Sequence, residues 1–121
     1  MNRNGKLSLQ QGALGEAAVL KELIKQGYTI FTQFSGHSPF DLVAYKDSML
    51  FRVSVKSTIV DEGYPSWRVN LYQGSHGKFT GFDKTSADIL AVYIVPEDRV
   101  VLFDTNTITN IRSISIPKED K

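Results

Sequence analysis

The fold depends most on residues 38–56, which read SPFDLVAYKDSMLFRVSVK. Two runs of apolar and β-branched residues flank the polar segment 46–48, which is the pattern of two strands joined by a tight turn. The first strand begins at Asp41, and Pro39 favours an extended chain just before it. Because cross-strand neighbours lie about 5 Å apart, the Asp41 carboxylate and Lys56, near the end of the second strand, can converge on one point.

The second strand of this hairpin, residues 49–59, alternates in a way that sorts its side chains onto two faces. An acid and a lysine that meet beside such a strand suit a divalent cation and a phosphate. The carboxylate is a hard oxygen ligand, and the ammonium can stabilise a developing oxyanion or orient an attacking water. One face carries Leu50, Arg52, Ser54 and Lys56, and the other carries Phe51, Val53 and Val55.

An amphipathic helix is predicted before the hairpin, from Leu9 to Gln26. Ser8 is the expected N-cap, and Gly27 follows the last turn as a C-terminal glycine does. The apolar stripe expected to face the core consists of Leu9, Ala13, Ala17, Leu20 and Ile24.

Glu16 lies at the margin of that stripe, so its carboxylate can reach a site beside the sheet. The alternative is that Glu16 is an ordinary, partly exposed helix residue. Gly12 and Gly15, one turn apart, each lower the helix propensity by about 1 kcal/mol relative to alanine. Glycines in this place suit the close approach of a strand or of a DNA backbone.

The rest of the chain is rich in strand patterns. Residues 73–86 combine three glycines with polar residues and show no apolar periodicity, so they predict a long loop. Residues 106–116 alternate weakly, which leaves a short helix and an edge strand both open. Further strands are expected at residues 28–34, 67–72, 89–95 and 99–103.

The composition of the 121 residues sets broad limits on function. The length fits a single domain, residues 1–121. Fourteen Lys and Arg against 13 Asp and Glu give a formal net charge of +1, so overall charge does not indicate a polyanionic partner. The sequence has no cysteine, which excludes a thiolate metal site and a cysteine nucleophile. No apolar run approaches the ~20 residues of a membrane helix, so we expect no membrane partner and a cytoplasmic location.

The order of these features resembles the PD-(D/E)XK nuclease superfamily, whose core has a helix glutamate, an aspartate after a proline and an acid-x-lysine triplet. Glu16 matches the helix glutamate, Asp41 the aspartate and Lys56 the lysine. Ser54 stands where an acid is usual. The resemblance implies an α/β (α+β) fold with a restriction-endonuclease-like core, in which helices flank a mixed central β-sheet.

Within the superfamily, residues 12–56 are most similar to phage and group I intron-associated homing endonucleases. That similarity implies Mg²⁺-dependent, site-specific hydrolysis of phosphodiester bonds in duplex DNA, inside a prokaryotic or phage-infected cell. Archaeal-type Holliday junction resolvases are the next most similar; they read junction shape, and a more basic surface would be expected of one. A third alternative is a non-catalytic DNA-binding relic of the same fold, with Ser54 as the sign of decay.

The resemblance also implies a role for each site residue. Asp41 would bind the metal directly, the backbone carbonyl of Val55 would add a ligand, and Glu16 would hold a water in the metal's coordination shell. The expected metal is Mg²⁺, with Mn²⁺ as the alternative. Lys56 would orient or deprotonate the attacking water and offset charge on the scissile phosphate. Ser54 would supply a neutral hydroxyl to the catalytic set, so metal affinity should be lower than with the usual acid.

DNA contacts are expected from the loops and strand faces that flank the site. Double-stranded DNA has two strands to cut and one small domain cuts one of them, so double-strand cleavage implies a homodimer or a higher homo-oligomer. The candidate DNA-binding residues are Ser35, His37, Ser38, Arg52, His76, Lys78 and Lys84.

Overall fold

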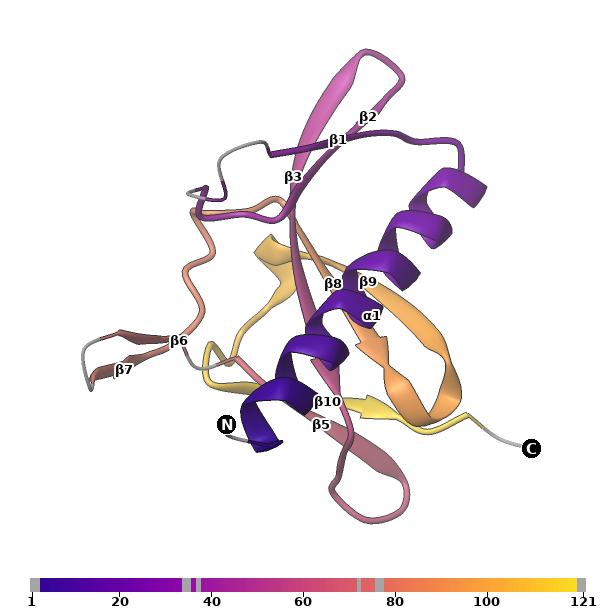
Figure 1. Ribbon diagram of the computed structural model, residues 1–121. Coiled ribbons are helices and arrows are strands. Elements are labelled where there is room, and N and C mark those ends of the chain that lie inside the picture. Colours follow the sequence, from indigo (N-terminus) through magenta and orange to yellow (C-terminus); the bar gives the residue numbers. More distant parts are fainter. Residues whose placement is uncertain (1–2, 34–35, 37, 72, 76–77, 120–121) are drawn as a thin grey trace.

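A five-stranded mixed sheet with one α-helix packed across it forms the centre of the molecule (Figure 1). The computed structural model describes residues 3–33, 36, 38–71, 73–75 and 78–119. The strand order is β1-β2-β3-β8-β9, and the central pair β3 and β8 is parallel while the other pairs are antiparallel. The strands are β1 (Thr29–Thr32), β2 (Leu42–Lys46), β3 (Met49–Thr58), β8 (Ile89–Ile94) and β9 (Arg99–Asp104).

Two smaller sheets complete the described part of the chain. A three-stranded sheet has the order β10-β5-β4, and β6 pairs only with β7 in a hairpin that projects away from the body of the molecule (Figure 1). The strands are β4 (Val60–Asp61), β5 (Ser66–Asn70), β6 (Gln73–Ser75), β7 (Lys78–Thr80) and β10 (Ser113–Pro117). The short 3₁₀ helices are η1 (Val95–Glu97) and η2 (Thr105–Thr107).

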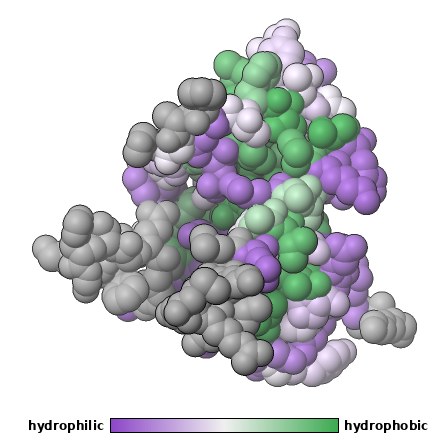
Figure 2. Space-filling model, viewed as in Figure 1, coloured by the Kyte–Doolittle hydropathy of each residue, from purple (hydrophilic) through white to green (hydrophobic). Residues whose placement is uncertain are grey.

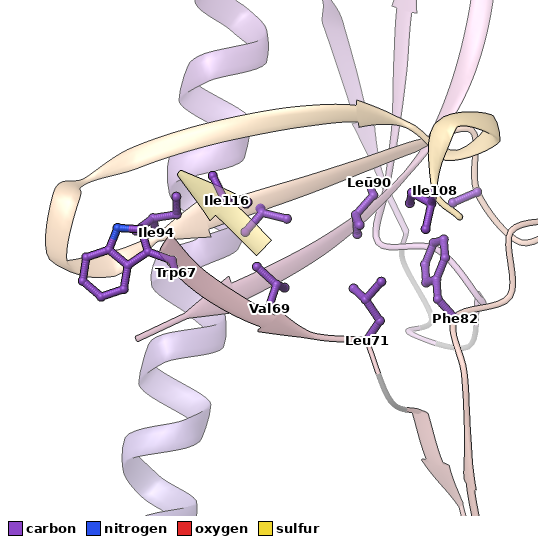
Figure 3. Close-up of a cluster of buried hydrophobic side chains, with 10 residues drawn as sticks. Trp67, Val69, Leu71, Phe82, Leu90, Ile94, Ile108 and Ile116 are labelled. Atoms are coloured by element: carbon purple, nitrogen blue, oxygen red, sulfur yellow. The ribbon is translucent and has the colours of Figure 1, made fainter. Parts of the chain in front are cut away.

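The core has two layers, one on each face of the central sheet. On one face, Val19 and Leu23 of the helix are fully buried against Leu42, Ala44 and Val53. Burial of each large aliphatic side chain contributes about 1.5–3 kcal/mol. On the other face, β5 packs on β8, as Figure 3 shows, through the buried side chains Trp67, Val69, Leu71, Leu90 and Ile94.

The expected mixed central sheet is confirmed, and among the described residues one α-helix flanks it. In the residues that the structure describes, α1 (Arg3–Lys25) covers one face and the β10-β5-β4 sheet covers the other. The alternating side chains of β5 bury one face, with Trp67 and Val69 inward and Arg68 exposed, which is why a sheet can take the place of a helix there. The fold is α+β, as expected. The described helix is not long and apolar enough to cross a membrane.

The helix differs from its prediction at its start. It begins at Arg3, so Ser8 lies inside the helix and is not its N-cap. Residues 3–8 contain no proline, and their one glycine, Gly5, costs only about 1 kcal/mol, so nothing prevents this extension. Its end is confirmed: Gly27 has φ +95°, and the Tyr28 N–H donates to the Leu23 carbonyl at 3.0 Å, which closes a Schellman-type cap.

The predicted apolar stripe of the helix is wrong. The side that is buried consists of Gly15, Val19 and Leu23, whereas Ala17 is exposed and Ile24 is 56% exposed. Gly15 explains the difference, because a Cβ atom there would lie only 2.0 Å from Ser57 Oγ of β3. The helix thus approaches β3 closely at a residue without a side chain, which a hydrophobic pattern does not reveal.

The β2–β3 hairpin is confirmed. Its last cross-strand pair is Lys46 with Met49, and the two turn residues, Asp47 (φ 53°) and Ser48 (φ 65°), both have the positive φ values of a type I′ turn. Of the alternatives open for residues 106–116, the edge strand holds for 113–116, which belong to β10 and pair antiparallel with β5, whereas residues 106 and 107 lie in the 3₁₀ helix η2.

The long loop expected over residues 73–86 is corrected in part. Backbone pairing of β6 with β7 joins Gln73 to Thr80 and Ser75 to Lys78. The two strands have three residues each and pair through backbone hydrogen bonds, which three-residue segments do not reveal as apolar alternation in the sequence.

Candidate active site

Asp41 is fixed against β3 at the point where β2 begins. Its backbone N–H donates to the Val53 carbonyl at 2.9 Å, and its carboxylate Oδ2 accepts the Val55 N–H at 2.7 Å. Because Leu42 pairs with Val53, Asp41 stands one step further along, opposite Ser54. The β2–β3 pairing ends at Leu42 and Val53, and the Val55 N–H, the next group of β3 on that side, donates to the Asp41 side chain and not to the backbone of β2.

Two hollows meet at Asp41 and Glu16. The larger, of about 510 Å³, lies between α1 and the edge of β3, and we call it the cleft. The smaller, of about 340 Å³, opens toward the end of β1. Glu16 and Asp41 line both hollows. The cleft is lined by Gln11, Gly12, Ala13, Glu16, Asp41, Val55, Lys56 and Ser57. The smaller hollow is lined by Glu16, Ala17, Leu20, Thr32, Gln33, Asp41 and Leu42.

The structure therefore brings Glu16, Asp41, Val55 and Lys56 to one cleft. Glu16 is exposed, and Asp41 and Lys56 are half-buried, so the cleft is open to a large substrate. Ser54 is not brought to it: its residue is only 7% exposed, and it is not among the described residues that line the cleft. Its hydroxyl suits this burial, since an acid in the same position would lose hydration. The catalytic roles of all these residues stay predictions.

The donors at the cleft fit a hard divalent cation. The N–H of Val55 points to Asp41, and in a strand the N–H and C=O of one residue lie on the same edge, so the Val55 carbonyl also faces that side, beyond the start of β2. With the carboxylates of Asp41 and Glu16 this gives an all-oxygen set, which suits Mg²⁺ or Mn²⁺. Within the described residues, no three His, Cys, Asp or Glu side chains gather into a metal cluster.

Arg52, expected to contact DNA, is held by Asp88. Its Nε and Nη2 atoms donate to the two Asp88 carboxylate oxygens, each at 3.1 Å, and Nη1 donates to the Thr85 carbonyl at 2.9 Å. The hydrogen bonds from Arg52 lower the pKa of Asp88, and the same pairing raises the pKa of Arg52. The guanidinium thus joins the start of β3 to the segment before β8.

The other candidate DNA contacts are placed only in part. The Ser38 hydroxyl accepts the Phe40 N–H at 3.3 Å, and Lys84 donates to the Ile108 carbonyl at 3.0 Å. Lys78 belongs to β7, but its side chain lies outside the described part of the structure. Ser35, His37 and His76 lie outside the described residues altogether. DNA binding by all seven stays a prediction.

Residues that line the hollows but were not singled out from the sequence include Gln11, Gln33 and Ser57. Gln11 and Ser57 meet where the helix approaches β3, and the Ser57 hydroxyl donates to the Gln11 carbonyl at 3.4 Å. Gly15 was the signal for that approach. For Gln33, a lone polar residue after a strand, the sequence holds no signal.

Comparisons with known proteins identify relatives of the sequence and of the fold. Residues 8–120 match the family model described as PD-(D/E)XK endonuclease. Among solved structures, the chain is similar to a bacterial homing endonuclease, I-Ssp6803I, with a TM-score of 0.77 and 18% identity over 93% of this chain and 79% of the other. At that identity the likeness shows the fold. No curated protein matches the sequence.

Family membership implies phosphodiesterase activity on DNA, and nucleases of this family typically use divalent metals. Because the family model spans nearly the whole chain, the resemblance read from the sequence is confirmed, and Glu16, Asp41 and Lys56 of the motif line one cleft. The chain belongs to the PD-(D/E)XK endonuclease family.

Proposed function

We propose that this protein is a Mg²⁺-dependent, site-specific DNA endonuclease of the homing type. The observation that carries the proposal is the placement of Asp41, whose carboxylate is held by the Val55 amide in a cleft that Glu16 and Lys56 also line. A carboxylate that is fixed before substrate arrives needs no reorganisation to bind a cation, which is the condition for effective electrostatic catalysis. The fold shared with a bacterial homing endonuclease supports the homing type over the resolvase.

The reaction hydrolyses one phosphodiester bond of DNA. The oxygen of a water forms a bond to phosphorus, the bond from phosphorus to a deoxyribose oxygen breaks, the water gives up one proton and the leaving oxygen takes one up. Bound Mg²⁺, or Mn²⁺, would polarise the phosphate and neutralise its charge. Asp41, Glu16 and the Val55 carbonyl would hold the ion. Lys56 would orient the water and offset the negative charge that develops on the phosphate.

The open cleft is suited to a polymer. Glu16 lies exposed on α1, and Gly12 and Ala13 leave the neighbouring helix surface without long side chains. A cation held here is therefore accessible to a phosphate of a DNA backbone. An enclosed pocket would exclude the DNA.

Cleavage of both strands would require a homodimer or a higher homo-oligomer, which we also propose. Apolar side chains reach the surface along α1 and over the β1–β3 end of the sheet (Figure 2). They offer surface that a second copy would bury. They include Leu14, Ile24, Phe31, Met49 and Leu50.

The test is cleavage of three substrates: supercoiled plasmid, linear duplexes that carry candidate sites, and a synthetic four-way junction. Each is incubated with Mg²⁺, with Mn²⁺ and with EDTA, alongside the variant Asp41→Ala. Discrete cuts in one duplex that need the metal and are lost in the variant would support the proposal. Cuts confined to the junction would favour a resolvase. DNA binding without cleavage of any substrate would favour the non-catalytic relic.

A further inference from the structure

The segment that leads into Asp41 is held by one side chain from the end of β1. The side-chain carbonyl Oε1 of Gln33 accepts the Ser38 N–H at 2.9 Å, and its Nε2 donates to the Phe40 carbonyl at 3.4 Å. The two backbone partners lie on either side of Pro39, and Phe40 directly precedes Asp41. Gln33 therefore bridges the turn from which Asp41 emerges.

The amide side chain of Gln33 is suited to both contacts. The Ser38 N–H can only donate and the Phe40 carbonyl can only accept, so the side chain that bridges them must both accept and donate a hydrogen bond. In Gln33 the oxygen Oε1 accepts and the nitrogen Nε2 donates. These partners also fix which way the amide faces. A glutamate in this position would keep the acceptor and lose the donor.

Gln33 also lies beside the candidate catalytic carboxylates. It lines the smaller hollow together with Glu16 and Asp41, yet its hydrogen bonds go to the backbone and not to either carboxylate. With the bond from the Asp41 N–H to the Val53 carbonyl, both the carbonyl and the N–H of the Phe40–Asp41 peptide are hydrogen-bonded. The peptide has little freedom left, and the Asp41 carboxylate stays on the Val55 amide.

We propose that Gln33 is a positioning residue for Asp41. It holds the Phe40–Asp41 peptide so that the carboxylate is in place before a cation or DNA arrives. Its effect on cleavage rests on the proposed function, whereas its effect on Asp41 does not. Loss of a residue that orients a metal ligand typically lowers metal affinity or activity by about 10–100-fold.

The first experiment needs no substrate. Hydrogen exchange of the Val55 amide, followed by NMR in the metal-free protein, reports whether the Asp41 carboxylate still accepts that N–H. In Gln33→Ala we expect exchange at Val55 to accelerate about tenfold or more, because local opening exposes the amide. Gln33→Glu, which keeps one contact, should lie between this variant and the parent protein, and it serves if Gln33→Ala does not fold.

The matched control is Gln26→Ala. Gln26 is also an exposed glutamine with a side-chain hydrogen bond, to Glu22 at 2.9 Å, but it follows the end of α1, about 15 Å along the helix axis from Glu16 at 1.5 Å per residue. Its loss should leave Val55 exchange unchanged. Equal Val55 exchange in the parent protein and both Gln33 variants would overturn the inference.

The second experiment uses single-turnover cleavage of whichever DNA the parent protein cuts. Gln33→Ala should raise the Mg²⁺ concentration for half-maximal rate about tenfold or more, with DNA affinity in Ca²⁺ unchanged. If Gln33→Ala instead binds DNA more weakly and needs the same Mg²⁺ concentration as the parent protein, Gln33 contacts DNA, and the positioning role is overturned. If the parent protein cuts no DNA, the proposed function fails, and Val55 exchange still decides the role of Gln33.

Discussion

The approach of α1 to β3 gives a prediction that separates two glycines on one helix. An alanine in a helix interior is favoured over glycine by about 1 kcal/mol. A Cβ atom on Gly12 would meet nothing within 4 Å, so Gly12→Ala should gain this free energy in full. A Cβ atom on Gly15 would lie 2.0 Å from Ser57 Oγ, 3.4 Å from Ser57 Cβ and 3.8 Å from Val55 Cγ1. Overpacking of this kind costs about 1–3 kcal/mol.

Because the helix-propensity gain is the same for both variants, the difference between them isolates the packing cost. We therefore expect Gly12→Ala to be more stable than Gly15→Ala by about 1–3 kcal/mol. Urea unfolding with a shared m-value measures this difference as a shift in midpoint. Adding Ser57→Ala to Gly15→Ala removes the closest atom and should recover part of the loss. Equal stability of the two glycine variants would refute the close contact of α1 with β3, and with it the geometry of the cleft.

Three further predictions concern single side chains. Lys56→Met should slow single-turnover cleavage by about 100-fold or more while DNA affinity in Ca²⁺ changes little, because a donor to the developing charge is lost; equal rates would remove Lys56 from the chemistry. Ser54→Ala should leave the cleavage rate unchanged, since Ser54 does not line the cleft; a large loss would place its hydroxyl in the site. Asp88→Asn should destabilise the protein at neutral pH. The folded-state pKa of Asp88 lies below its ordinary value of 3.8, so its stabilisation is present above that value and disappears as pH falls through the lower folded-state pKa. Urea midpoints of the parent protein and the variant should converge in acid, and a constant gap would contradict the Arg52 pairing.

The hairpin and the residues at its site were predictable because their signals are local. Alternation and the residues 46–48 define two strands and a turn, and the pairing of Leu42 with Val53 then brings Asp41 to β3. Glu16 could be placed from helix periodicity although the predicted stripe was wrong. On the helix surface it lies between the predicted stripe and the side that is buried, so it is at the margin of both.

The features that were missed depend on contacts between distant segments. The buried side of α1 is set by the fit of Gly15 against Ser57, and the cover on the second face of the sheet is set by β5 and β10, which pair across more than 40 residues of sequence. Gln33 acts through backbone groups that become its neighbours only after the chain turns at Pro39. Hydrophobic periodicity carries no information about such contacts.

The central claim, that Asp41 holds a cation for DNA cleavage, is tested most directly by comparing Asp41→Asn with Asp47→Asn. Asparagine at residue 41 can keep the hydrogen bond from the Val55 N–H while the charge is lost. Asp47 lies in the turn at the other end of β2, about 20 Å away at ~3.3 Å per residue, and asparagine tolerates its positive φ. The account predicts that Mg²⁺-dependent cleavage persists in Asp47→Asn and is abolished in Asp41→Asn at unchanged stability. Equal cleavage by both variants, or cleavage that continues in EDTA, would contradict it.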